Sequence, residues 1–290
     1  IRHHLPSVDC RVVALFRKGQ ALLPEANTFK YPTADVDLNM LIRKLDEVAY
    51  NSETPTMDTS EPTSKSTLYT EPIQIDSTTV IRTRMISDGY RPDMITNASY
   101  FINEKSALSV VSLIVSPNDL WKKRKGIYSN FENREIEASA HIQYFDTLKN
   151  GTFKLAISKS AKTRIAGKTS RRQPKKSFSF FATNEDGNGE RFNYRVFKDK
   201  NIEDFGGLWV RADATSGRNV SDLWVGERFK NELLYEVNKE MSGQVDMQAY
   251  EPVSVYLNGQ YWGLYNLMER KGKDFIYNNH GEKEVDILTS

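Results

Sequence analysis

The sequence predicts an α+β protein in which an N-terminal β-sandwich precedes a lobe made of an antiparallel sheet and a helix. Three observations indicate this fold class. Residues 79–86 alternate between apolar and polar side chains, as in a half-buried strand. Apolar residues recur at helical spacing after Asp222. The pair Asn258-Gly259 separates two aromatic, β-branched segments, which is typical of a tight hairpin because both residues accept positive φ angles.

Length and composition set broad limits on domain number and partners. The chain has 290 residues, of which 40 are basic and 38 acidic, and its formal charge is +2 at pH 7. This length favours two domains, and the balanced charge gives no reason to expect nucleic acid as a partner. Cys10 is the single cysteine, which excludes an intrachain disulfide and a thiolate metal site. No apolar run approaches the ~20 residues of a membrane span, so none is expected.

The first 49 residues have the weakest pattern. Residues 11–15 fit a short strand. Residues 37–48 place apolar side chains at a helical period, but an edge strand of the sandwich fits the same residues. Both interpretations stay open.

A Thr-, Ser- and Pro-rich stretch over residues 51–70 predicts turns. It contains Asp58-Thr59-Ser60-Glu61-Pro62-Thr63 and leads into Leu68-Tyr69-Thr70-Glu71-Pro72-Ile73. These segments resemble the immunoglobulin-like C-terminal domain of chitobiases and β-hexosaminidases, although Thr59 and Glu71 replace glycines of that pattern. With strands over 79–86 and 98–102, the resemblance implies a β-sandwich domain over residues 1–103, which ends near 103–106.

The second domain, residues 104–290, is expected to contain strands and one helix. We predict strands over 108–115, 138–145, 153–157, 176–181 and 205–212. A helix is predicted from Asp222 to about Ser242-Gly243, because residues 223–237 carry an apolar stripe. The hairpin over residues 250–270 closes the domain.

Two motifs of this domain carry a family resemblance. One is the basic segment Gly167-Lys168-Thr169-Ser170-Arg171-Arg172-Gln173-Pro174-Lys175-Lys176-Ser177, and the other is the hairpin, which contains Val255-Tyr256-Leu257-Asn258-Gly259 and closes on Glu269-Arg270. They resemble the Gly-x-x-Ser-Arg-x-x-Pro-x-Lys-Ser and Tyr-x-Pro-x-x-Val-Tyr-Leu-Asn-Gly patterns of the CotH family of atypical protein kinases. The resemblance covers about Leu108 to the end.

The resemblance implies an ATP-dependent Ser/Thr protein kinase of a bacterial envelope, cell surface or spore coat, with ATP and Mg as cofactors. In that family the catalytic aspartate and the metal ligands belong to a large lobe. No segment of this sequence matches those elements, so the chain is interpreted as the N-terminal part of a CotH-like domain, incomplete and inactive alone. We assign neither a catalytic residue nor a metal ligand.

The order of a lysine-bearing strand, a helix and a hairpin is similar to the small lobe of a protein kinase, where a strand lysine binds phosphate and a helix glutamate holds it. Lys176 is the candidate lysine, and Lys175 would face the opposite side; which face lines a nucleotide cleft stays open. Glu232 is favoured over Glu227 and Glu236 as its partner. Ordinary solvated ion pairs with Lys230 and Lys239 would explain these glutamates equally well.

Two further segments are nucleotide-binding candidates. Arg171 lies in the basic motif and is expected either to contact phosphates or to belong to a solvated loop. The resemblance suggests the segment from Met268 to Arg270, which includes Glu269, as the hinge that reads an adenine edge. The alternative function is a noncatalytic surface or scaffold module that binds a carbohydrate or protein partner.

Overall fold

The computed structural model describes residues 9–15, 61–70, 72–86, 95–184, 187–212, 218–220, 223–225, 230–241 and 245–287. The helix expected over residues 37–48 and the candidate Glu227 lie outside these ranges. The strand expected over residues 11–15 is observed as β1 (Asp9–Leu15). Most other regular structure in the described part is also β.

A closed barrel of seven strands, in the order β11-β15-β14-β5-β6-β7-β8, forms the main body of the molecule. Its strands are β5 (Ser109–Val115), β6 (Ala138–Thr147), β7 (Phe153–Ala166), β8 (Ser177–Ala182), β11 (Gly207–Arg211), β14 (Tyr250–Leu257) and β15 (Gln260–Glu269). All neighbours pair antiparallel except β5 and β14, which run parallel. β11 pairs with both β8 and β15 and so closes the barrel.

The predicted α+β fold class is therefore wrong for the second domain. A kinase-like lobe needs an open antiparallel sheet beside a helix, whereas this sheet closes on itself. Local alternation predicted the strands, but β11 joins partners that are remote in sequence, such as Phe180 for Leu208 and Leu267 for Val210. Strand partners over such distances depend on the packing of the whole barrel and leave no local pattern.

The predicted helix also begins later than expected. α3 spans Lys230–Glu240, while the preceding residues form a small hairpin of β12 (Arg218–Val220) and β13 (Leu223–Val225). The aromatic Trp224 and the β-branched Val225 favour a strand over a first helical turn. The other helices are α2 (Pro117–Trp121), the 3-10 turn η2 (Thr169–Arg172) and α4 (Lys273–His280). A short pair, β9 (Phe192–Asn193) and β10 (Asp204–Phe205), lies outside the barrel.

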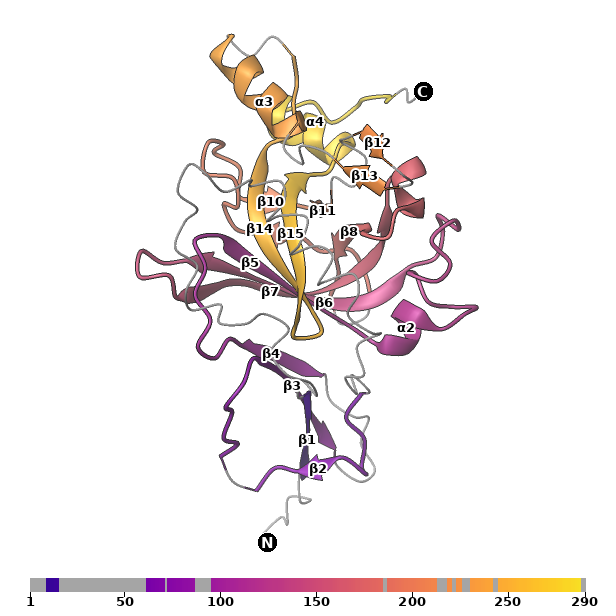
Figure 1. Ribbon diagram of the computed structural model, residues 1–290, viewed down its shortest axis with the longest axis vertical. Coiled ribbons are helices and arrows are strands. Elements are labelled where there is room, and N and C mark those ends of the chain that lie inside the picture. Colours follow the sequence, from indigo (N-terminus) through magenta and orange to yellow (C-terminus); the bar gives the residue numbers. More distant parts are fainter. Residues whose placement is uncertain are drawn as a thin grey trace, which may run out of the picture.

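The N-terminal sheet consists of β1 to β4 in the order β2-β1-β3-β4, with β2 at Thr67–Leu68, β3 at Thr79–Ile86 and β4 at Thr96–Tyr100. Figure 1 shows this sheet at one end of the molecule and α3 and α4 at the opposite end. It contacts the barrel directly: the Ser99 and Ser112 hydroxyls lie 2.8 Å apart, and the Ser99 N–H donates to Gln143 Oε1 at 2.9 Å. Every residue of β5 is buried, because one face points into the barrel and the other is covered by this sheet and neighbouring side chains.

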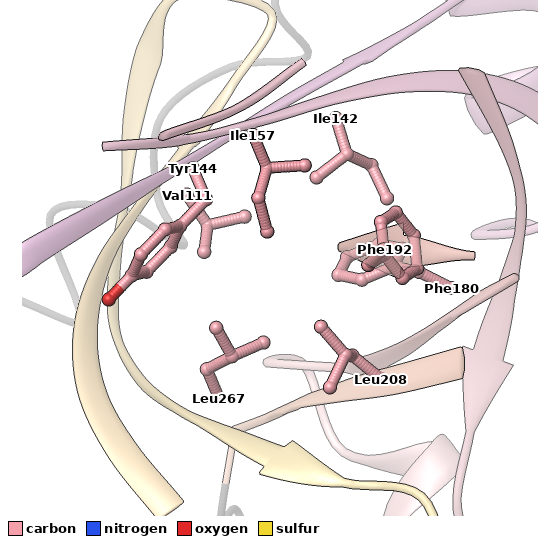
Figure 2. Close-up of a pocket in the computed structure, with 8 residues that line it drawn as sticks. All are labelled: Val111, Ile142, Tyr144, Ile157, Phe180, Phe192, Leu208 and Leu267. Atoms are coloured by element: carbon pink, nitrogen blue, oxygen red, sulfur yellow. The ribbon is translucent and has the colours of Figure 1, made fainter. Parts of the chain in front are cut away.

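The barrel interior is filled by side chains. Figure 2 shows eight residues around the remaining space, seven of them aliphatic or Phe together with Tyr144. That cavity measures about 10 Å³, which is at the lower limit for one water molecule. This cavity is therefore too small for a nucleotide or a sugar.

The predicted Asn258-Gly259 hairpin is observed, with φ angles of 52° and 79°. Asn258 is 1% exposed, and its Oδ1 accepts a 2.8 Å hydrogen bond from the Val115 N–H. The Asn258 N–H donates to the Leu113 carbonyl at 2.8 Å. The turn therefore anchors β14 and β15 to the end of β5.

We expect Asn258→Ala to lower the free energy of unfolding by about 2–4 kcal/mol, because it removes the hydrogen bond to the Val115 N–H and replaces asparagine, which tolerates positive φ, by alanine, which does not. Asn258→Gly is the matched control, since glycine accepts this φ and only the hydrogen bond is lost. Urea denaturation of both variants measures the difference. Equal losses in the two variants would show that backbone conformation contributes nothing here.

His141 lies between the barrel and the N-terminal sheet, with its Nε2 2.9 Å from Ser158 Oγ. Burial, and secondarily the charge of Arg82, lower the pKa of His141 to about 4. Between about pH 6.5 and pH 4, His141 therefore binds a proton in the unfolded chain and stays neutral in the folded chain. The stability that comes from this difference in pKa is fully present above pH 6.5 and is lost as the pH falls from 6.5 toward 4.

Between pH 7 and pH 4, the wild-type chain should lose up to about 3 kcal/mol more stability than His141→Asn, which cannot titrate. Urea denaturation at one-unit pH steps measures both curves. Parallel curves over this range would contradict the assigned role of His141.

Candidate functional site

A groove of about 270 Å³ lies on the outer face of the barrel. Strand pairing places Arg164 of β7 and Trp209 of β11 on either side of Ser179 of β8. These side chains point outward because their strand neighbours, Ile165 and Leu208 among them, are part of the core. The lining residues are Arg134, Glu135, Arg164, Ile165, Ala166, Gly167, Arg171, Ser179, Trp209 and Arg270.

The groove is strongly positive. Four arginines and one glutamate line it. Burial and the nearby charge of Arg164 lower the pKa of both Arg171 and Arg270, and Arg134 also acts on Arg171. Arg164 lies 3.8 Å from the carboxylate of Glu137, but no ion pair among the described residues involves Arg134, Arg171 or Arg270. Positive charges that repel one another in a concave site favour the binding of an anion.

The guanidinium groups are held in place before any ligand binds. Arg171 is 7% exposed; its Nε donates to the Gly167 carbonyl and one Nη to the Phe131 carbonyl, both at 2.7 Å. Arg164 and Arg270 both lie against the Phe181 ring, at 5.0 Å and 4.8 Å from its centroid. Fixed guanidinium groups bind phosphate and carboxylate with little further loss of conformational entropy.

Of the predicted phosphate contacts, Arg171 lines this groove, as does Arg270 from the end of the predicted hinge segment. Lys175 and Lys176 both precede β8, which begins at Ser177, so strand alternation does not orient them. Lys176 is 5% exposed and donates to two backbone carbonyls, those of Arg171 at 2.6 Å and Gln173 at 3.0 Å. No ion pair in the described part of the chain includes Lys176, so the expected pair with Glu232 is not formed in this structure.

The remaining candidates do not line the groove, although Met268 pairs with Trp209, which does. Glu232 of α3 is 4% exposed, and its Oε1 accepts a 2.7 Å hydrogen bond from Asn266. Met268 and Glu269 are buried within β15, opposite Trp209 and Leu208 of β11. The Glu269 N–H donates to the Ala249 carbonyl and its own carbonyl accepts from Gln248, so this backbone is already engaged.

Glu269 forms a buried ion pair that the sequence did not indicate. Its Oε2 lies 2.5 Å from Lys200 Nζ, and the two side chains are 3% and 17% exposed. Asn279 of α4 bonds both partners, at 2.7 Å to Lys200 and 3.1 Å to Glu269. The Glu269 carboxylate therefore fastens α4 and the Lys200 loop to the barrel.

Two arginines and a tryptophan of the groove, Arg134, Arg164 and Trp209, were missed by sequence reasoning, and Arg270 was predicted only as part of the hinge segment. Arg164 could have been found, since a charged residue that alternates with the buried Ile165 points outward from a strand. Arg134 and Trp209 had no such signal, because they join the groove only through barrel closure and the packing of loops.

Two additional findings limit the chemistry of this site. Within the ranges that the structure describes, no group of three His, Cys, Asp or Glu side chains is placed to hold a metal ion. The groove itself offers one carboxylate, Glu135, among four cations, and this set does not fit Mg.

Among the described helices, none has the length and apolar character needed to cross a bilayer.

Sequence comparisons confirm the two resemblances and their order along the chain. Residues 163–289 match the CotH kinase protein family, and residues 55–97 match the chitobiase/β-hexosaminidase C-terminal domain. No curated protein matches the chain. The CotH match includes Arg164, Arg171, Trp209 and Arg270 of the groove.

Glu269→Ala should lower the free energy of unfolding by about 3–5 kcal/mol, because Lys200 is left buried without its carboxylate. Glu251→Ala is the control: Glu251 pairs at 3.8 Å with Lys198, which is 78% exposed, and a pair of that kind contributes below about 1 kcal/mol. Urea denaturation compares the variants. Similar losses of unfolding free energy in Glu269→Ala and Glu251→Ala would show that the Glu269–Lys200 ion pair does not stabilise the attachment of α4 to the barrel.

Proposed function

We propose that this CotH-like chain binds a nucleoside triphosphate by its phosphates in the arginine groove, as part of an ATP-dependent Ser/Thr protein kinase. The observation that carries the proposal is the convergence of four arginines, from four separate segments, on one space of about 270 Å³. This volume is near the lower end of the range for small-molecule sites. A triphosphate carries enough negative charge to neutralise the cluster.

Arginine suits this task for a geometric reason. Its planar guanidinium offers parallel N–H donors that match two phosphate oxygens at once. A hydrogen bond between charged partners contributes roughly 1.5–3 kcal/mol, so three contacts near the upper end of this range correspond to about micromolar binding. The Trp209 ring adds a flat apolar wall on which the nucleotide can rest.

Phosphoryl transfer depends on positioning and on charge stabilisation more than on covalent chemistry by the protein. Guanidinium groups fixed by Phe181 and by the Phe131 carbonyl would hold the phosphates with little reorganisation. The arginines of this chain would thus supply the charge stabilisation. We assign no base and no metal-dependent step, because the groove residues do not fit either role.

A second candidate function is a noncatalytic module at the cell surface that binds an acidic carbohydrate. The favouring observation is the hydrogen-bonded contact between the sugar-enzyme-like N-terminal sheet and the barrel, through Ser99, Ser112 and Gln143. The same cationic groove would accept sulfate or uronate groups. We propose an extracellular or envelope location for either function.

Arg164→Gln and Arg270→Gln should each weaken the binding of ATP and of inorganic tripolyphosphate by about tenfold, since each removes one charged contact. Isothermal titration calorimetry measures the affinity. Arg124→Gln, an exposed arginine outside the groove, makes the same charge change and should leave the affinity within about twofold.

Equal affinities in all four proteins, or no binding of either ligand at millimolar concentration, would refute the proposal. Tight binding of a sulfated oligosaccharide that ATP does not displace would support the second candidate. Incorporation of the ATP γ-phosphate into protein Ser or Thr, detected by mass spectrometry, separates a kinase from a binding module.

A further inference from the structure

Lys176 lies where the two walls of the arginine groove meet. One wall is η2, which carries Arg171, and the other is the loop 131–135, which carries Arg134 and Glu135. The Lys176 ammonium donates to the carbonyls of Arg171 and Gln173 on the first wall. It also lies 4.0 Å from the centroid of the Phe131 ring on the second.

Arg171 also links the two walls of the groove. Its guanidinium reaches across to the Phe131 carbonyl at 2.7 Å, while its own carbonyl accepts from Lys176 at 2.6 Å. The Tyr128 hydroxyl donates to the Pro174 carbonyl at 3.2 Å, and its ring lies 5.4 Å from the Lys176 ammonium. One ammonium therefore contacts the backbone of one wall and two aromatic rings leading into the other.

We propose that Lys176 is a positioning residue of the groove: its ammonium holds the two walls at the separation at which the guanidiniums converge on one phosphate chain. This inference rests on the proposed function. It assigns to the lysine of the basic motif a contact with backbone carbonyls and aromatic rings instead of a contact with phosphate. Loss of the ammonium would let the walls separate and disperse the arginines.

The protonation state of Lys176 gives this role a distinctive signature. Burial lowers the pKa of Lys176 to about 8. The charged or titratable side chains on the surrounding elements are Tyr128, Glu132, Arg134, Glu135, Lys168, Arg171, Arg172 and Lys175, and Arg172 pairs with Glu132 at 3.4 Å. Above pH 8 the amine loses its charge, so its bonds to the carbonyls and its attraction to the rings weaken.

The test compares Lys176→Met, Lys176→Arg and Lys175→Met by titration calorimetry with inorganic tripolyphosphate. At pH 7 we expect Lys176→Met to bind at least tenfold more weakly than wild type, and Lys176→Arg within about threefold. Lys175→Met is the matched control and should stay within about twofold, because Lys175 contacts the Leu264 carbonyl and the Tyr265 ring instead.

A pH series separates positioning from a general effect on folding. From pH 7 to pH 9.5, wild-type affinity should fall several-fold relative to Lys176→Arg, because arginine keeps its charge. The ratio of the two proteins at each pH cancels the ionisation of the ligand itself. A constant ratio, or wild-type affinity in Lys176→Met, would overturn the proposal.

Hydrogen exchange gives a readout that does not depend on binding. Lys176→Met should raise amide exchange in segments 128–135 and 168–174, and Lys175→Met should leave both segments unchanged. If the wild-type chain fails to bind tripolyphosphate, the proposed function fails. Exchange then decides the positioning role separately, and unchanged exchange in Lys176→Met would refute it.

Discussion

Closure of the barrel by β11 is the constraint on which the other features depend. Because β11 pairs with both β8 and β15, the side chains of these strands are divided into an inner set and an outer set. The inner set fills the barrel and leaves a void of only about 10 Å³. The outer set brings Arg164, Ser179 and Trp209 side by side, with Arg270 just beyond β15. The groove is thus a consequence of strand register, and no interior site competes with it.

The groove concentrates positive charge that folding alone does not favour. Arg171 and Arg270 are partly desolvated and repel Arg164, so their pKa values are lowered. Backbone carbonyls and the Phe181 ring offset part of this cost without neutralising the charge. Strained or costly arrangements of this kind are expected at functional sites, where a ligand supplies the missing interaction. This concentration of positive charge is the basis of the proposed binding of an anion.

Sequence patterns predicted local structure better than they predicted tertiary pairing. The Asn258-Gly259 turn and most barrel strands were predicted because alternation and turn chemistry are local. The barrel itself was not, since Leu208 and Phe180 meet only when the sheet closes. For the site, Arg171 lines the groove and its role in binding stays a prediction, whereas Lys176 contacts backbone carbonyls and Glu269 pairs with Lys200. A basic motif shows which residues carry positive charge, but the fold determines which groups those residues contact.

The most direct test of the central claim is an experimental structure of the chain with bound ATP. The account predicts phosphate density between the guanidiniums of Arg164, Arg171 and Arg270, with the base toward Trp209. Lys176 should remain on the carbonyls of Arg171 and Gln173. Phosphates bound by Lys176 itself, or located outside the groove beside Glu232 and Asn266, would contradict it.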